Sequence, residues 1–276
     1  MNPVRKDRPF FYLTLKDVLT IICAAAIPIA LAIYTTINSR DAQKQAEEAR
    51  KFDLNQSYHA RQHLLYDQFL DNIYQLDKDG HLENNKTPWA FANAYYRAAH
   101  RQWDPIRKSD ILQFLKEKEL IGRSNCTDEC GKKPLEDIIR LIDLNFDYIQ
   151  LVSQTGRYNS IKLDCVSFEE LSMNNALFSS VNLNGAYFSG GQLNNVKFEG
   201  SSLTCATFEN VDMRGVDFGT SNMQDLQFRN ADLTGAKLND DQLKQARFYN
   251  TTLPNGAISG NDLRSKSICF LYRSQQ

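Results

Sequence analysis

The chain has 276 residues, with 32 lysines and arginines, 33 aspartates and glutamates, and a formal net charge of −1. The composition is that of a globular protein, and it lacks the basic excess that would point to a nucleic-acid partner. At about 150 residues per domain, this length corresponds to about two domains.

Residues 18–37 are expected to cross a lipid bilayer. This stretch of twenty residues contains no charged side chain, and a helix of that length rises about 30 Å, the thickness of the hydrocarbon core. The alternatives are a buried helix and a cleaved signal peptide. However, the apolar region of a signal peptide is usually about 7–15 residues long and is followed by small residues at a cleavage site, a pattern that is missing here.

The orientation of this span depends on the charges beside it. Residues 1–17 form a basic tail with a local net charge of +2, but lysines and arginines also follow the span. The positive-inside rule therefore hardly separates the two orientations. Because the N-terminal amine adds one more positive charge, we expect a single-pass membrane protein with a cytoplasmic N-terminus.

Residues 38–76 are expected to form a stalk helix. The stretch from Arg40 to Leu76 contains no glycine or proline, and its apolar residues keep a helical spacing. The apolar stripe is thin in the first half. We therefore expect any self-association through the stalk to depend on weak contacts.

Residues 77–158 are expected to form a small helical bundle. Pro88, Pro105 and Pro134 each stand where a first helical residue would be, a position that needs no backbone N–H. Asp104 can cap the second of these helices. The third helix would bury one apolar face, formed by Leu135, Ile138, Ile142 and Ile149.

A five-residue period begins at Leu163. Every fifth residue from there to Ile268 is leucine, phenylalanine, methionine or isoleucine, over 22 positions without exception. A helix repeats its face every 3.6 residues and a strand every 2.0 residues, so neither explains the spacing. A square coil explains the spacing if each of its four sides holds five residues. The central residue of each side would point inward, and so would the small residue two places before it. Successive turns of twenty residues would then pair like strands, at about 4.8 Å.

A ten-residue alternation supports the square coil. Phenylalanine occupies every second inward position, and leucine or methionine occupies the others. Ten residues are half a turn, so phenylalanine would fill one pair of opposite sides. The predicted core ladder consists of Leu163, Phe168, Met173, Phe178, Leu183, Phe188, Leu193, Phe198, Leu203, Phe208, Met213, Phe218, Met223, Phe228, Leu233 and Leu238.

This repeat resembles the pentapeptide-repeat family, whose pattern is A(D/N)LXX; NADLTGAKL, from Asn230 to Leu238, is close to that pattern. The resemblance covers residues 159–258 and implies a right-handed quadrilateral β-helix of about 4–5 coils. The expected fold class is therefore an α + β solenoid, with an N-terminal transmembrane helix, a helical stalk and bundle, and a C-terminal β-helix. The matched residues are core and corner residues, so the resemblance implies no catalytic residue and no cofactor.

Polar residues at the small inward positions mark the end of the β-helix. They begin at Asp241 and Thr251 and continue at Asn261 and Lys266. The segment that starts at Asp240 is equally consistent with a short capping helix. We assign residues 259–276 to a C-terminal cap or tail.

The chain has six cysteines, which argues against a disulfide scaffold. Cys126 and Cys130 lie close together in a polar loop. They are candidates for a disulfide if that loop is exocytoplasmic, and otherwise they are free thiols. Cys165 and Cys205 fall at outward corner positions two coils apart. That separation is about 9.6 Å, beyond the limit of about 7 Å for a bridge between them.

No metal or cofactor site is expected. His59 and His63 have an i, i+4 spacing that would suit a metal, but HARQH lacks the glutamate of a metalloprotease. A solvated helix face is favoured. The N-x-S/T sequons matter only if the C-terminal part is outside the cell; they begin at Asn55, Asn85, Asn125 and Asn250.

We predict a non-enzymatic, membrane-anchored protein whose rod-like β-helix serves as a scaffold for an unidentified protein partner. One alternative is a DNA-mimic-like inhibitor of a nucleic-acid enzyme, as some soluble members of the family are. Residues 159–258 carry 11 acidic and 7 basic residues, a net charge of −4, which is weak for mimicry, and we expect no nucleic-acid partner. The other alternative is an enzyme with a thiol or metal site in the helical bundle.

Overall fold

The computed structural model of the chain describes residues 14–82, 89–123, 137–152 and 161–260. The chain divides into two compact units, Met1–Ala60 and Arg61–Gln276. Most of the predicted basic tail and nearly all of the predicted C-terminal tail lie outside the described residues, as do Pro88 and Pro134.

α1 (Leu15–Lys78) is one continuous helix of 64 residues, so the predicted span and stalk belong to a single element. Thr14 and Asp17 cap its start. Asp17 Oδ2 accepts a hydrogen bond from Thr14 N at 3.0 Å, and Thr14 Oγ1 accepts one from Asp17 N at 3.3 Å. This reciprocal arrangement occupies donors that the first turn leaves unpaired.

In the first unit, the apolar side chains of α1 are exposed and pack against no other described residue. Ile21 and Ile29 are each 58% exposed, and Leu31 is 57% exposed. Among the described residues, α1 is the one helix that is long and apolar enough to cross a membrane, by length and composition.

In the second unit, the last part of α1 packs with α2 (Trp89–His100) and α3 (Pro105–Glu117). The centroid of the Phe69 ring lies 5.9 Å from that of Tyr96 and 5.2 Å from that of Trp103. All three side chains are at most 4% exposed. These aromatic rings form the centre of a small helical bundle.

α3 begins as the Asp104–Pro105 pair predicted. Asp104 is the N-cap, and its carboxylate accepts a hydrogen bond from Arg107 N at 2.9 Å. The Gln62 side chain on α1 holds this start in place. It donates to Gln102 O at 2.9 Å and accepts from Asp104 N at 3.0 Å.

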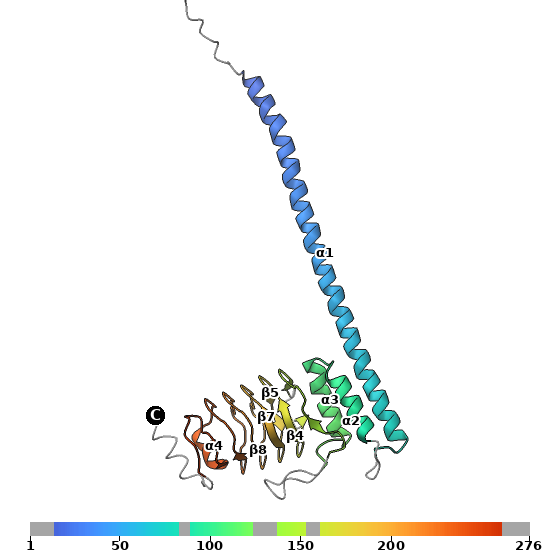
Figure 1. The fold of residues 1–276 in the computed structure, drawn as a ribbon. Helices are drawn as coiled ribbons and strands as arrows, with labels where there is room; N and C mark the ends of the chain where they lie inside the picture. Colours follow the sequence, from blue (N-terminus) through green and yellow to red (C-terminus); the bar gives the residue numbers. More distant parts are fainter. Residues whose placement is uncertain (1–13, 83–88, 124–136, 153–160, 261–276) are drawn as a thin grey trace, which may run out of the picture. The chain divides into compact units, whose positions relative to one another are not determined.

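The remainder of the second unit is a β-solenoid of about four turns (Figure 1), and its coils follow one another in chain order. One sheet of parallel strands runs through β4, β7, β8, β9 and β10 in that order, and paired residues are twenty apart in the sequence. Phe168 therefore lies opposite Phe188, and Phe188 lies opposite Phe208. Isolated parallel bridges such as Gln192 to Asp212 continue the same interval. The strands are β1 (Leu141–Ile142), β2 (Gln150–Val152), β3 (Ile161–Lys162), β4 (Ser167–Ser172), β5 (Leu177–Ser179), β6 (Val181–Asn182), β7 (Tyr187–Gln192), β8 (Thr207–Glu209), β9 (Gln227–Arg229) and β10 (Arg247–Tyr249).

The core of the β-solenoid is a stack of phenylalanine rings. Neighbouring centroids in one column are 4.6–5.6 Å apart, with nearly parallel planes. That column contains Phe168, Phe188, Phe208, Phe228 and Phe248. A second column, built from Phe178, Phe198 and Phe218, is stacked in the same way. Ring therefore lies over ring because each coil has the same length.

One inward position requires glycine. Gly191 has a φ of +91°, and a Cβ there would lie 2.1 Å from Leu171 O in the coil before it. No side chain fits at that distance. The two backbones therefore approach each other closely at this side of the coil.

The helix predicted within residues 137–152 is wrong. This stretch contains β1 and β2, and Leu141 pairs with Phe168 of β4. Leu141, Phe146 and Leu151 are five residues apart and at most 1% exposed, so a partial coil precedes the first predicted coil. The same apolar residues also satisfy a helical spacing. Strand pairing is preferred because the edge of the first full coil has backbone groups that need partners.

α3 covers this N-terminal end of the β-solenoid. Its apolar face is buried, and two lysines bond to the coil backbone. Lys116 Nζ donates to Gly122 O at 2.7 Å and to Asp164 O at 2.8 Å. Lys108 Nζ donates to Asn145 O at 2.7 Å. The two lysines thus pair with the coil carbonyls of Asp164 and Asn145, and Lys116 also binds the carbonyl of Gly122 in the segment after α3.

α4 (Asp240–Gln245) replaces one side of the last coil, as the capping-helix alternative predicted. Asn239 and Gln242 form a capping box at its start. Gln242 Nε2 also donates to Gly219 O at 3.1 Å and to Ser221 O at 3.2 Å. The side-chain amide of Gln242 therefore donates hydrogen bonds to two carbonyl groups that would otherwise pair with the backbone of a further strand.

The polar residues at small inward positions differ in their placement. Asp241 is exposed on α4, whereas Thr251 is fully buried and its hydroxyl donates to Tyr249 O at 3.0 Å. Thr251 is tolerated inside because its hydroxyl has a partner. Asn261 and Lys266 lie outside the described residues.

Candidate interaction surface

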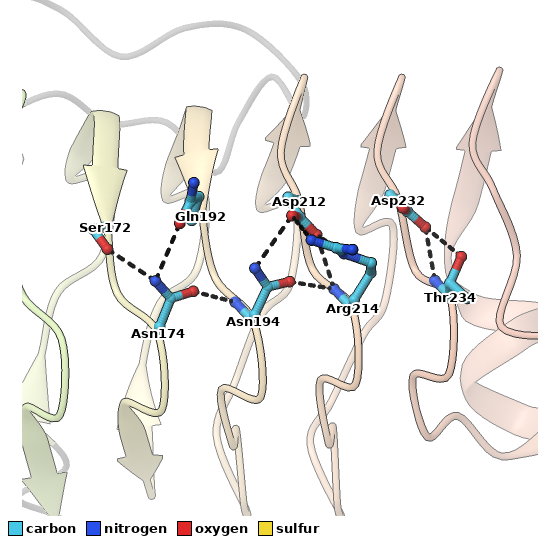
Figure 2. Close-up of polar contacts among 8 residues, drawn as sticks. All are labelled: Ser172, Asn174, Gln192, Asn194, Asp212, Arg214, Asp232 and Thr234. Atoms are coloured by element: carbon cyan, nitrogen blue, oxygen red, sulfur yellow. Dashed lines mark hydrogen bonds and ion pairs between the residues drawn. The ribbon is translucent and has the colours of Figure 1, made fainter.

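One side of the β-solenoid carries a continuous row of polar side chains (Figure 2), which we call the polar ladder. Its members stand one place before and one place after a central core residue, so they point outward. Parallel bridges from Gln192 to Asp212 and from Asp212 to Asp232 keep the coils in register. The polar ladder consists of Ser172, Asn174, Gln192, Asn194, Asp212, Arg214, Asp232 and Thr234.

Two asparagines connect successive coils of the polar ladder. Asn174 Oδ1 accepts a hydrogen bond from Asn194 N at 3.0 Å, and Asn194 Oδ1 accepts one from Arg214 N at 3.0 Å. Asn174 Nδ2 donates to Ser172 Oγ at 3.0 Å. The ladder therefore satisfies backbone N–H groups that strand pairing leaves open.

An ion pair occupies the middle of the ladder. Asp212 accepts from Arg214 Nε at 2.8 Å and from a terminal guanidinium nitrogen at 2.7 Å, which is a bidentate arrangement. The hydrogen bond from Arg214 holds the pKa of Asp212 below its usual range. The Arg214 side chain is 59% exposed, so the pair adds little stability and its guanidinium face stays accessible to solvent.

Other outward rows are polar too, and they extend the same construction. Lys237 pairs with Asp217 at 2.9 Å, one coil below it. Arg247 pairs with Asp225 at 2.6 Å. At one corner column, asparagine amides form a chain through Asn210, Asn230 and Asn250.

The outward sides of the β-solenoid carry mostly polar side chains. The described residues hold no group of three or more His, Cys, Asp or Glu side chains that would bind a metal ion. The outward groups are amides, hydroxyls and ion pairs whose hydrogen bonds run mostly within the ladder. Such a surface is suited to binding, because its side chains already have fixed orientations.

The residues of the predicted core ladder lie inside the β-solenoid. Fifteen of them are at most 1% exposed, and Leu238 is partly buried against them. They hold the walls in place and do not reach the outer surface. Sequence periodicity identified this interior but not the side-chain hydrogen bonds that connect the polar ladder.

The two stalk histidines have other neighbours in place of a metal. In the first unit, the His59 ring lies edge-on to Tyr58, with centroids 5.7 Å apart. In the second unit, His63 Nε2 lies 2.9 Å from a guanidinium nitrogen of Arg107. The arginine donor occupies a ring nitrogen that a metal ion would need.

The predicted pair Cys126 and Cys130 lies outside the described residues. Cys165 and Cys205 are each disulfide-bonded and are 3% and 8% exposed. Sequence reasoning missed this because it weighed only a bond between those two. Cys23, in the apolar part of α1, is a free thiol.

The helical bundle contains several buried polar atoms. Tyr96 Oη, His100 Nε2 and Trp103 Nε1 are buried and have no hydrogen-bond partner among the described residues. Burial, helped by the charge of Lys108, lowers the pKa of His100 to about 3. The ring of His100 lies edge-on to Phe146 at 4.6 Å, so it serves as a neutral core residue.

A pocket of about 440 Å³ lies beside α2. The Arg123 guanidinium carbon is 5.9 Å from the centroid of the Trp89 ring, and Asn93 accepts from Arg140 N at 2.8 Å. The pocket is lined by Trp89, Ala90, Asn93, Ala94, Arg97 and Arg140. The described residues of this lining are cationic, aromatic or amide side chains and alanines.

The fold and this surface define a β-solenoid repeat protein with a long N-terminal helix. The family model for pentapeptide repeats matches residues 161–200 and 201–240, in eight copies. Residues 161–240 are therefore pentapeptide repeats, and the recognition of this repeat from its five-residue period is confirmed.

Several solved structures are similar to this chain. HetL, a pentapeptide repeat protein involved in heterocyst differentiation regulation from Nostoc sp. strain PCC 7120, is 20% identical over 42% of this chain and 52% of its own, with a TM-score of 0.36. The chain thus spans about half the length of HetL. A pentapeptide repeat protein from the Arabidopsis thaliana thylakoid lumen is 21% identical over 48% of this chain and 75% of its own, with a TM-score of 0.20.

A third similar structure is a form of QnrB1, a plasmid-mediated fluoroquinolone resistance protein. It is 14% identical over 48% of this chain and 79% of its own, with a TM-score of 0.20. Among curated proteins, no sequence matches this chain significantly.

Proposed function

We propose that this chain is a non-enzymatic, single-pass membrane protein that presents its pentapeptide-repeat β-solenoid to a protein partner, with its N-terminus in the cytoplasm. The observation that carries the proposal is the exposed apolar part of α1. Ile22 is 58% exposed and Ile33 is 55% exposed. Burying one such side chain is worth about 1.5–3 kcal/mol, and a bilayer supplies that burial over the whole stretch.

The stalk supports a role away from the bilayer surface. Residues 38–60 are helical and exposed, and a helix of that length rises about 35 Å. It contains neither glycine nor proline. Exposed Phe52 and Tyr58 provide the weak apolar contacts through which two stalks would associate.

The polar ladder supports binding rather than catalysis. Its asparagines are tied to neighbouring coils, so fewer side chains lose freedom when a partner docks. Arg214 presents an exposed guanidinium at the centre of the row, and arginine is enriched at protein interfaces. A flat, hydrogen-bonding side of this kind fits a folded protein partner.

Alkaline extraction of membranes tests the anchor. The full chain is expected to stay in the membrane pellet. The double variant Ile27→Lys/Leu31→Lys places two charges in the span, each at a cost of about 2.5–3.5 kcal/mol, and should move to the soluble fraction. A matched control, Phe52→Lys/Gln56→Lys, has the same spacing on the stalk and should stay in the pellet. Extraction of the unaltered chain would contradict the anchor.

Photo-crosslinking in cells tests the interaction surface. A crosslinking residue at Thr234 on the polar ladder should give a discrete heavier product, and Arg214→Glu in the same chain should weaken it. The same crosslinker at Lys51 on the stalk serves as the control position. If ladder positions give no product while the protein is at the membrane, the polar ladder is not the binding side.

A further inference from the structure

One corner of the β-solenoid is covered over three consecutive coils. Cys165, Gly185 and Cys205 occupy the same corner position, with φ values of 61°, 63° and 59°. All three are buried. Corner residues on another column, Asn175 and Asn195, are exposed. The burial of this column therefore does not follow from the coil geometry and needs a covering group.

The disulfides of this corner do not join Cys165 to Cys205. Both residues are disulfide-bonded, but they are two coils apart, about 9.6 Å, whereas bridged Cα atoms lie within about 7 Å. Cys23 is free. The sequence contains three other cysteines as partners within the chain: Cys126, Cys130 and Cys269.

We propose that two disulfides attach this corner to other parts of the chain, and that the β-solenoid therefore lies in an oxidising, exocytoplasmic compartment. Disulfides persist in such compartments and are reduced in the cytosol. The bonded state and the burial of Cys165 and Cys205 are the observations behind this proposal.

The chemistry of this step is ordinary thiol–disulfide exchange. Each pair of thiols gives two electrons and two protons to the disulfide of an oxidoreductase, which becomes a dithiol. Cys23 stays reduced because it lies in the apolar part of α1, where an aqueous oxidoreductase does not reach it. The position of Cys23 rests on the proposed membrane anchor, whereas the disulfides at the corner do not.

Differential thiol labelling of the full chain tests the proposal. Source cells are lysed in N-ethylmaleimide, and the denatured protein is then reduced and labelled with maleimide–polyethylene glycol. We expect four of the six cysteines to be labelled only after reduction. Cys165→Ser and Cys205→Ser should each lower this number by two, because the released partner is blocked at lysis. Cys23→Ser is the matched control and should leave the number unchanged.

Three results would overturn the proposal. One is the absence of any label that depends on reduction. Another is a label that Cys165→Ser and Cys205→Ser leave unchanged. The third is a covalent dimer on a non-reducing gel, which would place the partner cysteines in another molecule. Peptide mapping of the unreduced chain identifies which of the three candidate cysteines are used.

The same membranes separate this inference from the anchor. If the chain resists alkaline extraction but all thiols are reduced, the membrane anchor is supported and the exocytoplasmic location is contradicted. If the disulfides are present but the chain is extracted, the exocytoplasmic location is supported and the membrane anchor is contradicted. Protection of a C-terminal tag from protease added on the cytosolic side gives a second readout of orientation, and its digestion would contradict the proposal.

Discussion

Phe208 lies at the middle of a column of five stacked rings. Its centroid is 4.6 Å from that of Phe188 and 5.6 Å from that of Phe228, and the ring planes differ by 15–17°. Truncating such a residue to alanine commonly costs about 3–5 kcal/mol. Because each ring supports the rings above and below, the identity of one core residue is constrained by the coils on either side.

The buried His100 should make stability depend on pH. Its pKa is lowered to about 3 in the folded chain, because burial disfavours the charged ring, and is about 6.5 when unfolded. Between these values the unfolded state binds one proton more than the folded state. The free energy of unfolding should therefore fall by about 1.4 kcal/mol for each pH unit below about 6.5.

Urea unfolding of the full chain in detergent between pH 7 and pH 4 measures this effect. His100→Phe keeps an aromatic ring in the same place and should remove that part of the slope. His81→Gln, at an exposed position, is the control and should behave like the unaltered chain. An unchanged slope in His100→Phe would mean that another group causes the acid sensitivity.

At the residue scale, the sequence predicts the side chains that recur at a fixed spacing. The inward positions keep one class of side chain, so spacing alone predicts that Phe208 and its neighbours are core residues. The polar ladder has Ser172, Gln192 and Asp212 at equivalent outward positions. Side-chain hydrogen bonds connect its first three coils, and residue type is not constant along it, so periodicity does not predict these bonds.

Among the elements, α3 joins the bundle to the repeat, and Lys116 makes that junction. Lys116→Met keeps most of the apolar stem but leaves the carbonyls of Gly122 and Asp164 without their ammonium donor. A buried polar group without a partner costs about 1–3 kcal/mol. We therefore expect the free energy of unfolding, measured by urea titration, to fall by at least about 1 kcal/mol.

Lys118→Met is the matched control, because Lys118 is exposed just beyond the end of α3. Its change in stability should stay within about 0.5 kcal/mol. Equal effects of the two variants would show that Lys116 does not hold the cap in place.

The elements also differ in how far the sequence predicts them. The start of α3 follows from local chemistry, since Asp104 caps and Pro105 presets the first residue. Residues 137–152 have apolar residues that fit both a helical and a five-residue spacing. Pairing with the neighbouring coil, in which Phe168 lies opposite Leu141, favours the strand over the helix. A local sequence pattern does not show which segment will lie beside it.

At the scale of the whole molecule, the length of the coil is the strongest constraint on the fold. Deleting the twenty residues 207–226 joins Ala206 to Gln227 and places every later side chain on the wall it already occupies. Deleting only 207–211 moves each later residue by a quarter turn, so phenylalanines enter the leucine and methionine walls. We expect the first variant to keep a sheet-like circular dichroism spectrum and cooperative melting, and the second to lose the cooperative transition.

Both deletions keep Cys205, so a difference between them does not come from the disulfides. A cooperative transition in the five-residue deletion would contradict a stack that depends on columns of like residues. Loss of folding in the twenty-residue deletion would mean that the coils are not interchangeable.

The overall organisation was predictable because it depends on long, simple patterns. Twenty uncharged residues, a stretch without glycine or proline, and the five-residue period indicate the apolar helix, the stalk and the repeat. The bonding of Cys165 and Cys205 was not predictable. Disulfide partners depend on which segments meet in three dimensions, and sequence separation does not give that.

The coverage of the first coil by α3 and the insertion of α4 into the last have a further consequence. A parallel stack with bare edges is a template on which copies of the same strand can add, as in cross-β fibres. At one end Lys116 donates to Asp164 O, and near the other Gln242 donates to Ser221 O; an incoming strand would use such coil carbonyls. The β-solenoid should therefore keep a fixed number of coils at high local density and not polymerise end to end.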